Sequence, residues 1–325
     1  MKRPRTAILA ATAAVLVAGG LGLWWSWHPG KAGSASGSQT LETENLKLET
    51  RPPLHPAVAR IVGEGPAMPY LRFFHLLKEI PTDLAEHDIA ALLDLVSGPA
   101  PEAFRETEWG SLANDIEEAL TVQTRPSATV ARGLRDIYRD ESRPRIQRDY
   151  ALQHIGGFAI FLVRTRDDPM PEASREILDS LLADLRHAAS DPSKPWAGTS
   201  LNLLDGILRA AESRSIVVRD LDPAALVALA LPIAGNPSLP LNARLPALQL
   251  AGRHRSPEAA ALARSFLADP ASPVMLVQCS AAVLGQGGSR NDLPLLEDAL
   301  ASASRHTAPA LREAIRSLSP PQTHP

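Results

Sequence analysis

The chain of 325 residues has a single cysteine, Cys279, and few aromatic side chains. One cysteine excludes an intramolecular disulfide framework and any metal site that needs several thiolates. Aromatic residues make up only 4% of the chain, so a core must be built mainly from Ala, Leu, Val and Ile. The formal net charge of −3 argues against a globally basic nucleic-acid-binding protein. These absences leave an Ala- and Leu-rich globular protein of about two average domains' length.

The sequence also lacks the usual signatures of enzymatic and metal chemistry. Its nine histidines are scattered and form no HExxH motif or compact ligand set. No Gly-x-Ser-x-Gly elbow occurs, and the segment GQGG at 285–288 lacks the strand and the Gly-Lys-Ser/Thr of a phosphate loop. We therefore predict no catalytic, cofactor-binding or metal-binding residues, and no cofactor. His154 lies in an apolar stretch and is predicted to be a hydrogen-bonded core residue.

A long uncharged run follows the basic N-terminus. Lys2, Arg3 and Arg5 precede 22 uncharged residues, 6–27, and this run ends in three tryptophans. Its length matches a hydrocarbon core of about 30 Å, and tryptophan is enriched at membrane interfaces. We predict a single-pass anchor over 1–28 in a bacterial inner membrane, with the rest of the chain in the periplasm. The alternative is a cleaved signal sequence that leaves a secreted or soluble periplasmic protein.

Proline and glycine mark the expected boundaries of the folded part. Residues 29–53 read as a flexible Gly/Ser/Pro linker, 54–318 as an α-helical solenoid and 319–325 as a disordered tail. Within 54–318, apolar residues recur at helical spacing, and Asp222 and Ser256 precede prolines as N-cap residues would. The one β-branched run, 216–218, is too short to carry a sheet.

A weak internal repeat appears when the C-terminal part is shifted by 33 residues. Gly252 then falls on Gly285, where each glycine is predicted to end a helix in the left-handed conformation. The full set of identities in the 34 pairs from 240 to 273 is Pro240/Pro273, Gly252/Gly285, Ser256/Ser289, Leu262/Leu295, Leu267/Leu300 and Ala268/Ala301. Each unit reads as helix, Gly-containing turn and helix, so neighbouring units must stack to bury their apolar faces.

The two units, ARLPALQLAGRHRSPEAAALARSFLAD and CSAAVLGQGGSRNDLPLLEDALAS, resemble the HEAT-repeat family. The likeness is firm over 240–318; RDYALQHIG at 148–156 resembles the first helix of another unit, and a truncated copy from Ala308 fits a cap. This resemblance implies an α-solenoid and assigns no catalytic residue. The predicted fold class is therefore all-α: a HEAT-like helical-repeat solenoid preceded by an N-terminal transmembrane helix.

Charge is unevenly distributed over two consecutive segments. Residues 102–118 hold six acids and one arginine, and residues 125–148 hold three acids and seven arginines. Pairing between neighbouring helices, together with solvated helix faces, explains most of this uneven distribution of charge. The alternative is a surface for an anionic partner, with candidate residues Arg125, Arg132, Arg135, Arg139, Arg143, Arg145 and Arg148.

These observations predict a function in binding. The leading hypothesis is a membrane-tethered, extracytoplasmic helical-repeat scaffold for protein–protein interaction that is not an enzyme. Its expected partners are the membrane, through the N-terminal helix, and another envelope protein, but no nucleic acid. The alternative is a cell-envelope enzyme with carboxylate-based acid/base chemistry, because a fold alone does not exclude catalysis.

Overall fold

The computed structural model describes residues 52–165 and 170–319, and these residues form helices and turns without a strand. All of them belong to the second of the chain's two units, Pro52–Pro325. The described part contains fourteen α-helices and two short 3₁₀ helices, η2 (Gly65–Ala67) and η3 (Arg290–Asp292). The all-helical part of the predicted fold class is therefore confirmed.

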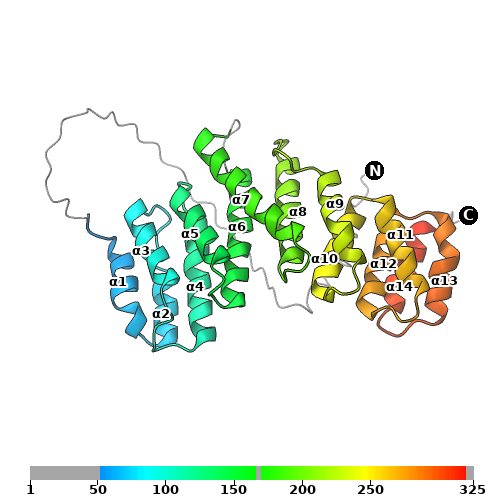
Figure 1. Ribbon diagram of the computed structural model, residues 1–325, viewed down its shortest axis with the longest axis horizontal. Helices are drawn as coiled ribbons and strands as arrows, with labels where there is room; N and C mark the ends of the chain where they lie inside the picture. The colour runs from blue at the N-terminus through cyan, green and yellow to red at the C-terminus, as the bar shows by residue number, and fades with distance from the viewer. Residues whose placement is uncertain (1–51, 166–169, 320–325) are drawn as a thin grey trace, which may run out of the picture. The chain divides into compact units, whose positions relative to one another are not determined.

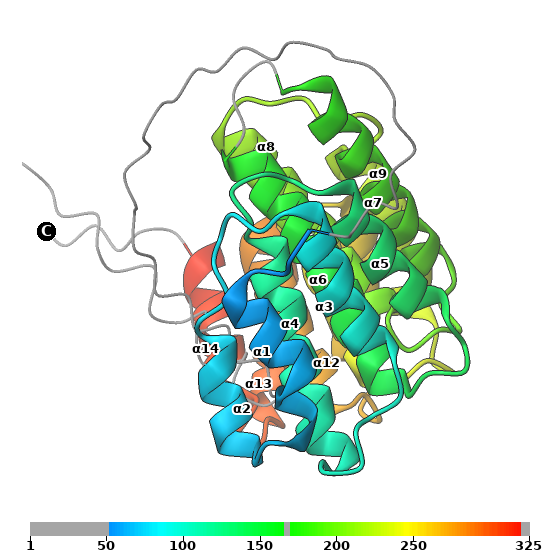
Figure 2. The same ribbon diagram turned by 90° about the vertical axis from the view of Figure 1, so that its left-hand side faces the viewer.

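The α-helices form two layers in which the chain alternates (Figures 1 and 2). One layer, called layer A, holds α1 (Pro56–Gly63), α3 (Glu86–Ser97), α5 (Ala128–Arg139), α7 (Glu172–Ser190), α9 (Pro223–Gly235), α11 (Pro257–Ala268) and α13 (Leu293–Ala301). The other, layer B, holds α2 (Tyr70–Leu77), α4 (Glu106–Thr121), α6 (Arg145–Thr165), α8 (Ala197–Ser213), α10 (Leu241–Arg253), α12 (Val274–Gly287) and α14 (Ala308–Leu318).

Packing follows the order of the chain. Each layer A helix packs on the layer B helix that follows it, and each layer B helix packs on the next one in its own layer. The segment 148–156 lies in α6, in the same layer as α10 and α12, and α1 to α5 continue the arrangement toward the N-terminus. The described helices are therefore packed in a solenoid-like manner, as expected for units that bury apolar faces against neighbours.

The two predicted N-cap residues cap their helices. The side chain of Asp222 accepts a hydrogen bond from the Ala225 amide at 2.8 Å, and that of Ser256 accepts one from the Ala259 amide at 3.2 Å. Each side chain satisfies an amide at a helix N-terminus that has no partner inside the helix, and proline follows each cap. These caps fix where α9 and α11 begin.

One apolar core runs through the described helices. Near its N-terminal end the rings of Phe73, Phe104 and Trp109 stack, with successive centroids 5.8 and 6.1 Å apart. The C-terminal part relies on Ala, Leu and Val, as the low aromatic content requires. Cys279 is buried there, and burial raises the pKa of its thiol to about 12, so the thiol stays protonated and unreactive.

Buried carboxylates join helices within a layer. Asp205 on α8 accepts a hydrogen bond from Arg253 of α10 at 2.6 Å, and its other oxygen lies 3.2 Å from Nε2 of His254. Asp292, at the end of η3, accepts one from Arg264 of α11 at 2.6 Å. Both carboxylates are at most 4% exposed, so removing these partners would leave a buried charge with less compensation, from Arg209 for Asp205 and from Ser289 for Asp292.

The predicted role of Gly252 and Gly285 is wrong. Neither glycine ends a helix in the left-handed region, because no described glycine has a positive φ; Gly252 lies within α10 and Gly285 within α12. A Cβ on Gly252 would collide with Val283 of α12, and one on Gly285 would lie 3.1 Å from Cα of Ala314 in α14. The two glycines are equivalent because each lets neighbouring layer B helices approach closely.

The membrane part of the predicted fold class also needs correction. Among residues 52–165 and 170–319, no helix is long and apolar enough to cross a membrane. The proposed span, 6–27, lies outside the described residues. We therefore withdraw the transmembrane anchor from the fold class, together with the inner-membrane and periplasmic location that depended on it.

Candidate functional site

The arginines of residues 125–148 do not pair with the acidic segment before them. No ion pair among the described residues joins 102–118 to 125–148. The predicted pairing is wrong because α4 and α5 make little contact, and two of the three arginines of α5 contact α7 instead. Arg135 and Arg139, one helical turn apart, both bind Asp184 of α7, which is 1% exposed.

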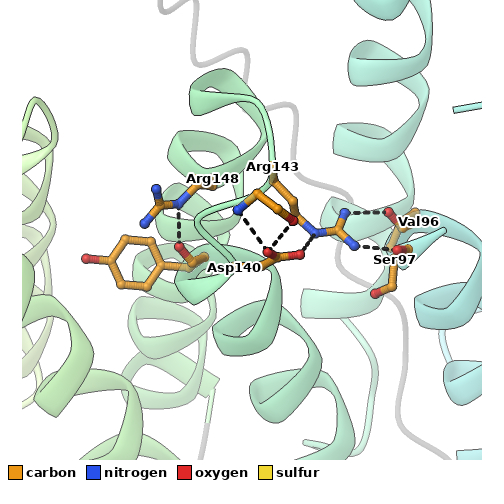
Figure 3. A network of polar contacts seen from close by, with 7 residues as sticks. Val96, Ser97, Asp140, Arg143 and Arg148 are labelled. Atoms are coloured by element: carbon orange, nitrogen blue, oxygen red, sulfur yellow. Dashed lines mark hydrogen bonds and ion pairs between the residues drawn. The ribbon is translucent and has the colours of Figure 1, made fainter. Parts of the chain in front are cut away.

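Arg143 stabilises the end of α3. Its two terminal nitrogens donate to the carbonyls of Val96, at 3.2 Å, and Ser97, while Nε donates to Asp140 at 3.1 Å (Figure 3). Carbonyls in the last turn of a helix have no partner inside it, so a cation there satisfies them and the helix dipole. Arg143 thus holds the α5–α6 connection against α3.

Arg148 has a different environment. Its Nε donates to the carbonyl of Tyr138 at 2.8 Å (Figure 3). Its guanidinium group lies 4.6 Å from the ring centroid of Trp196. The rings of Tyr138 and Trp196 meet edge to face, 5.7 Å apart. Within the described residues, the terminal nitrogens of Arg148 make no hydrogen bond or ion pair.

The predicted seven-arginine surface is therefore divided. Arg125, Arg132 and Arg145 are exposed and make no hydrogen bond or ion pair with the described residues. The other four, Arg135, Arg139, Arg143 and Arg148, hold helices together. Of these four, Arg148 and Arg135 bond only through Nε, and of the two only Arg148 has no carboxylate partner among the described residues.

A pocket of about 410 Å³ opens beside Arg148. Its walls include Tyr138, Arg148, His187, Lys194 and Trp196, and we call it the Arg148 pocket. Glu141 and Asp191 also border it, so the lining carries charges of both signs. Sequence reasoning found Arg139 and Arg148 but missed Lys194 and Trp196, which lie in and after a proline-containing turn between α7 and α8.

A second, larger groove adjoins the first. It has a volume of about 540 Å³ and lies between the C-terminal end of α7 and the start of α9; we call it the α7–α9 groove. Leu221, Leu226 and Leu229 supply apolar lining, and Arg186 and His187 line its α7 side. His187 borders both cavities.

The groove exists because layer A is interrupted. Among the described helices, α5 packs on α7, the contact between α9 and α11 is slight, and the contact between α7 and α9 is slighter still. The α8–α9 connection lies beside the gap, with Ser215 and Asp220 at positive φ and Val217 95% exposed. Arg186 fixes this connection by donating to the carbonyl of Arg219 at 2.6 Å. In the sequence, the β-branched run 216–218 was the one feature that set this connection apart.

A buried acid and base lie elsewhere, between α4 and α6. Nε2 of His154 lies 3.1 Å from Oδ1 of Asn114 and 3.8 Å from Oε2 of Glu117. Burial raises the pKa of Glu117 to about 8 and lowers the pKa of His154 to about 4, so both groups are neutral near pH 6. The prediction of a hydrogen-bonded core histidine is confirmed. Neither residue borders the two cavities described above.

Comparison with known proteins adds little to this geometry. No protein-family model and no curated protein matches the chain. A solved structure that does match is human deoxyhypusine hydroxylase in complex with glycerol; the match has 15% identity, covers 81% of this chain and 94% of that one, and has a TM-score of 0.29. At these values the likeness transfers neither a detailed fold nor an activity.

The predicted absence of catalysis needs correction. The matched protein is an enzyme, which is a statement about that protein alone. A helical fold by itself gives no ground for excluding catalysis. We therefore withdraw the prediction that the chain is not an enzyme, and with it the membrane-tethered, non-catalytic scaffold.

Proposed function

We propose that this chain is a helical-repeat protein that binds an acidic amphipathic helix of a partner protein in the α7–α9 groove. The observation that carries the proposal is the interruption of layer A, where two neighbouring helices leave an apolar groove of about 540 Å³ between them. A helix laid in an apolar groove is a common mode of peptide recognition. The incoming helix would supply the layer A contact that α7 and α9 do not make with each other.

The lining of the groove fits one face of such a helix. Ala225, Leu226, Ala228 and Leu229 follow the spacing of a single helical face on α9. Val217, 95% exposed on the neighbouring connection, offers further apolar contact. On the opposite side the groove is bordered by Arg186 and His187, which favours acidic residues at the α7 edge of the bound helix, away from Asp220 at the other edge.

The repeat type is part of the same proposal. We assign the pairs α10–α11 and α12–α13 to HEAT-type repeats. The support is the 33-residue offset, which places Gly252 and Gly285 at equivalent contacts between successive layer B helices. The same alternation of layers extends to α1, which supports counting the helices before α10 as more divergent repeats.

The test uses a labelled peptide of twenty residues with Leu at i, i+3, i+4 and i+7 spacing and Glu on its other face. Fluorescence anisotropy with the full chain should show saturable binding, and a companion peptide with Lys in place of Glu should bind at least tenfold more weakly. Ala228→Glu should weaken the binding of the acidic peptide about tenfold, because it adds bulk and like charge to the groove.

Ala224→Glu is the matched control. Ala224 is exposed on the same helix but outside the groove lining, so this change should leave binding within about twofold. The proposal is contradicted if the acidic and basic peptides bind equally well, or if neither binds. It is also contradicted if Ala228→Glu and Ala224→Glu weaken peptide binding equally.

A further inference from the structure

We propose that the Arg148 pocket binds a carboxylate group, held by the two terminal nitrogens of the Arg148 guanidinium group. This inference rests on the proposed function, because the pocket adjoins the α7–α9 groove through His187 and would receive an acidic side chain of the bound helix. It identifies the chemical group that selects the partner.

Arg148 is already held in a binding orientation. The hydrogen bond from Nε to Tyr138 fixes one edge of the guanidinium group, and the ring of Trp196 fixes its plane. The edge formed by the two terminal nitrogens remains unused among the described residues. A guanidinium group held this way can form two parallel hydrogen bonds to one carboxylate without first losing rotamer freedom.

The carboxylates near the pocket are engaged elsewhere. Asp184 binds Arg135 and Arg139. Asp191 accepts hydrogen bonds from the amide and hydroxyl of Ser193, and Glu141 lies 4.0 Å from Lys194. Arg148 is therefore a half-buried cation without an anionic partner among the described residues. Its charge is available to an anion that enters the pocket.

The mixed charge of the lining favours carboxylate over phosphate. Glu141 and Asp191 border the same pocket, so a doubly charged phosphate would meet two negative groups while it bound one guanidinium. A carboxylate carries a single charge and matches the planar edge of the guanidinium. His187, which lines both cavities, can approach the carboxylate from the side of the α7–α9 groove.

The experiment titrates the full chain with glutarate and, separately, with inorganic phosphate. The readout is the indole N–H signal of Trp196 in NMR spectra, assigned by its loss in Trp196→Phe. Glutarate should shift this signal saturably in the millimolar range, and phosphate should bind more weakly. An unmoved indole signal in the wild-type chain, or tighter binding of phosphate, would overturn the inference without reference to any variant.

Arg148→Lys tests the planar edge, because lysine keeps the charge but cannot make two parallel hydrogen bonds. It should weaken glutarate binding roughly tenfold, whereas Arg145→Gln, an exposed arginine on the same helix, should change it less than twofold. Circular dichroism of each variant verifies that the fold is kept. Equal glutarate binding by Arg148→Lys and the wild type contradicts the inference.

The two proposals can fail separately. If glutarate binds through Arg148 but the acidic helical peptide does not bind, the pocket inference stands and the proposed function is wrong. If the peptide binds with the same affinity to the wild type and to Arg148→Lys, the proposed function stands and Arg148 does not anchor the partner.

Discussion

Glu117 and His154 face each other in the interior between α4 and α6, and burial acts on them in opposite senses. Glu117 is 3% exposed, and its Oε2 makes no hydrogen bond. Burial raises the pKa of Glu117 to about 8, with a smaller opposing effect of Arg143, and lowers the pKa of His154 to about 4. Asn114, on the helix of Glu117, lies within hydrogen-bonding distance of the imidazole. Each side chain is most stable inside the protein when it is neutral.

We predict that stability falls on both sides of a weakly acidic optimum. The folded pKa of Glu117 lies above its unfolded value of about 4.3, so its contribution is complete below that pH and is lost as the pH rises through about 8. The folded pKa of His154 lies below its unfolded value of about 6.5, so its contribution is lost as the pH falls through about 4.

Glu117→Gln isolates the alkaline half of this dependence. At pH 9 the variant should unfold with a free energy about 2–4 kcal/mol above that of the wild type, because glutamine does not ionise inside the core. Below pH 4 it should have no advantage. Urea denaturation at several pH values measures this, and Glu118→Gln, an exposed neighbour on the same helix, should leave the pH dependence unchanged. Parallel pH curves for wild type and Glu117→Gln would show that Glu117 titrates normally.

A second prediction at this scale concerns Asp184. Replacing it with Asn removes the acceptor charge for Arg135 and Arg139, so the α5–α7 contact loses its ion pairs. Both arginines are partly exposed and can regain water, so we expect a cost of about 1–3 kcal/mol rather than the larger cost of stranding a fully buried charge. Thermal denaturation measures the loss. Asp136→Asn, exposed on α5, should stay within about 0.5 kcal/mol of the wild type.

At the scale of helices, contacts within layer B depend on small residues. Gly198 of α8 has the carbonyl oxygen of Asn242 and Cα of Ala243 within 2.9 and 3.0 Å of the point where a Cβ would lie. These are backbone atoms of α10, so they cannot move aside as a side-chain end can. Gly157 of α6 has nothing within 4 Å of the equivalent point.

These two glycines give a matched pair of substitutions. Gly198→Ala should destabilise the protein by about 1–3 kcal/mol, because α8 and α10 must separate to admit the methyl group. Gly157→Ala should stabilise it by about 0.5–1 kcal/mol, because alanine is the better helix former and meets no neighbour. Chemical denaturation of both variants measures the difference. A similar effect of the two changes would show that α8 and α10 are not in close contact at Gly198.

Helix positions were more predictable than the contacts between helices. Caps such as Asp222 and Ser256 act within one turn, so their role can be inferred from the local sequence. Gly252 was misassigned because glycine suits both a helix end and a close helix contact, and the choice depends on where Val283 lies in space. The α7–α9 groove was not predicted, because periodicity identifies the buried face of a helix but not the helix that covers it.

At the scale of the whole molecule, stability comes from neighbour-to-neighbour packing along two layers. The helix α12 packs on α10, α11 and α14, and its Leu276 and Leu284 are fully buried. In such an arrangement each unit covers the apolar face of the one before it, so the last units act as a cap. Within the described residues the buried apolar side chains form one cluster, so removing the C-terminal helices would expose apolar surface.

Truncation after residue 272 should therefore strongly destabilise the remaining helices. Removing α12, α13 and α14 uncovers the faces of α10 and α11, so we expect the shortened chain to aggregate, while a chain ending at residue 319 stays dispersed and helical. Size-exclusion chromatography with light scattering measures the first effect, and circular dichroism the second. A soluble, cooperatively unfolding fragment ending at 272 would mean that the last three helices form an independent unit.

The interruption between α7 and α9 also has a mechanical consequence. Because α7 and α9 make little contact, we expect load to pass between them mainly through α8 and its neighbours in layer B. A section with one continuous layer resists bending less than a section with two, so we expect the protein to bend readily here. A ligand helix seated in the gap would restore the second load path and stiffen the section. Occupancy of the groove would then determine how far the protein bends under force.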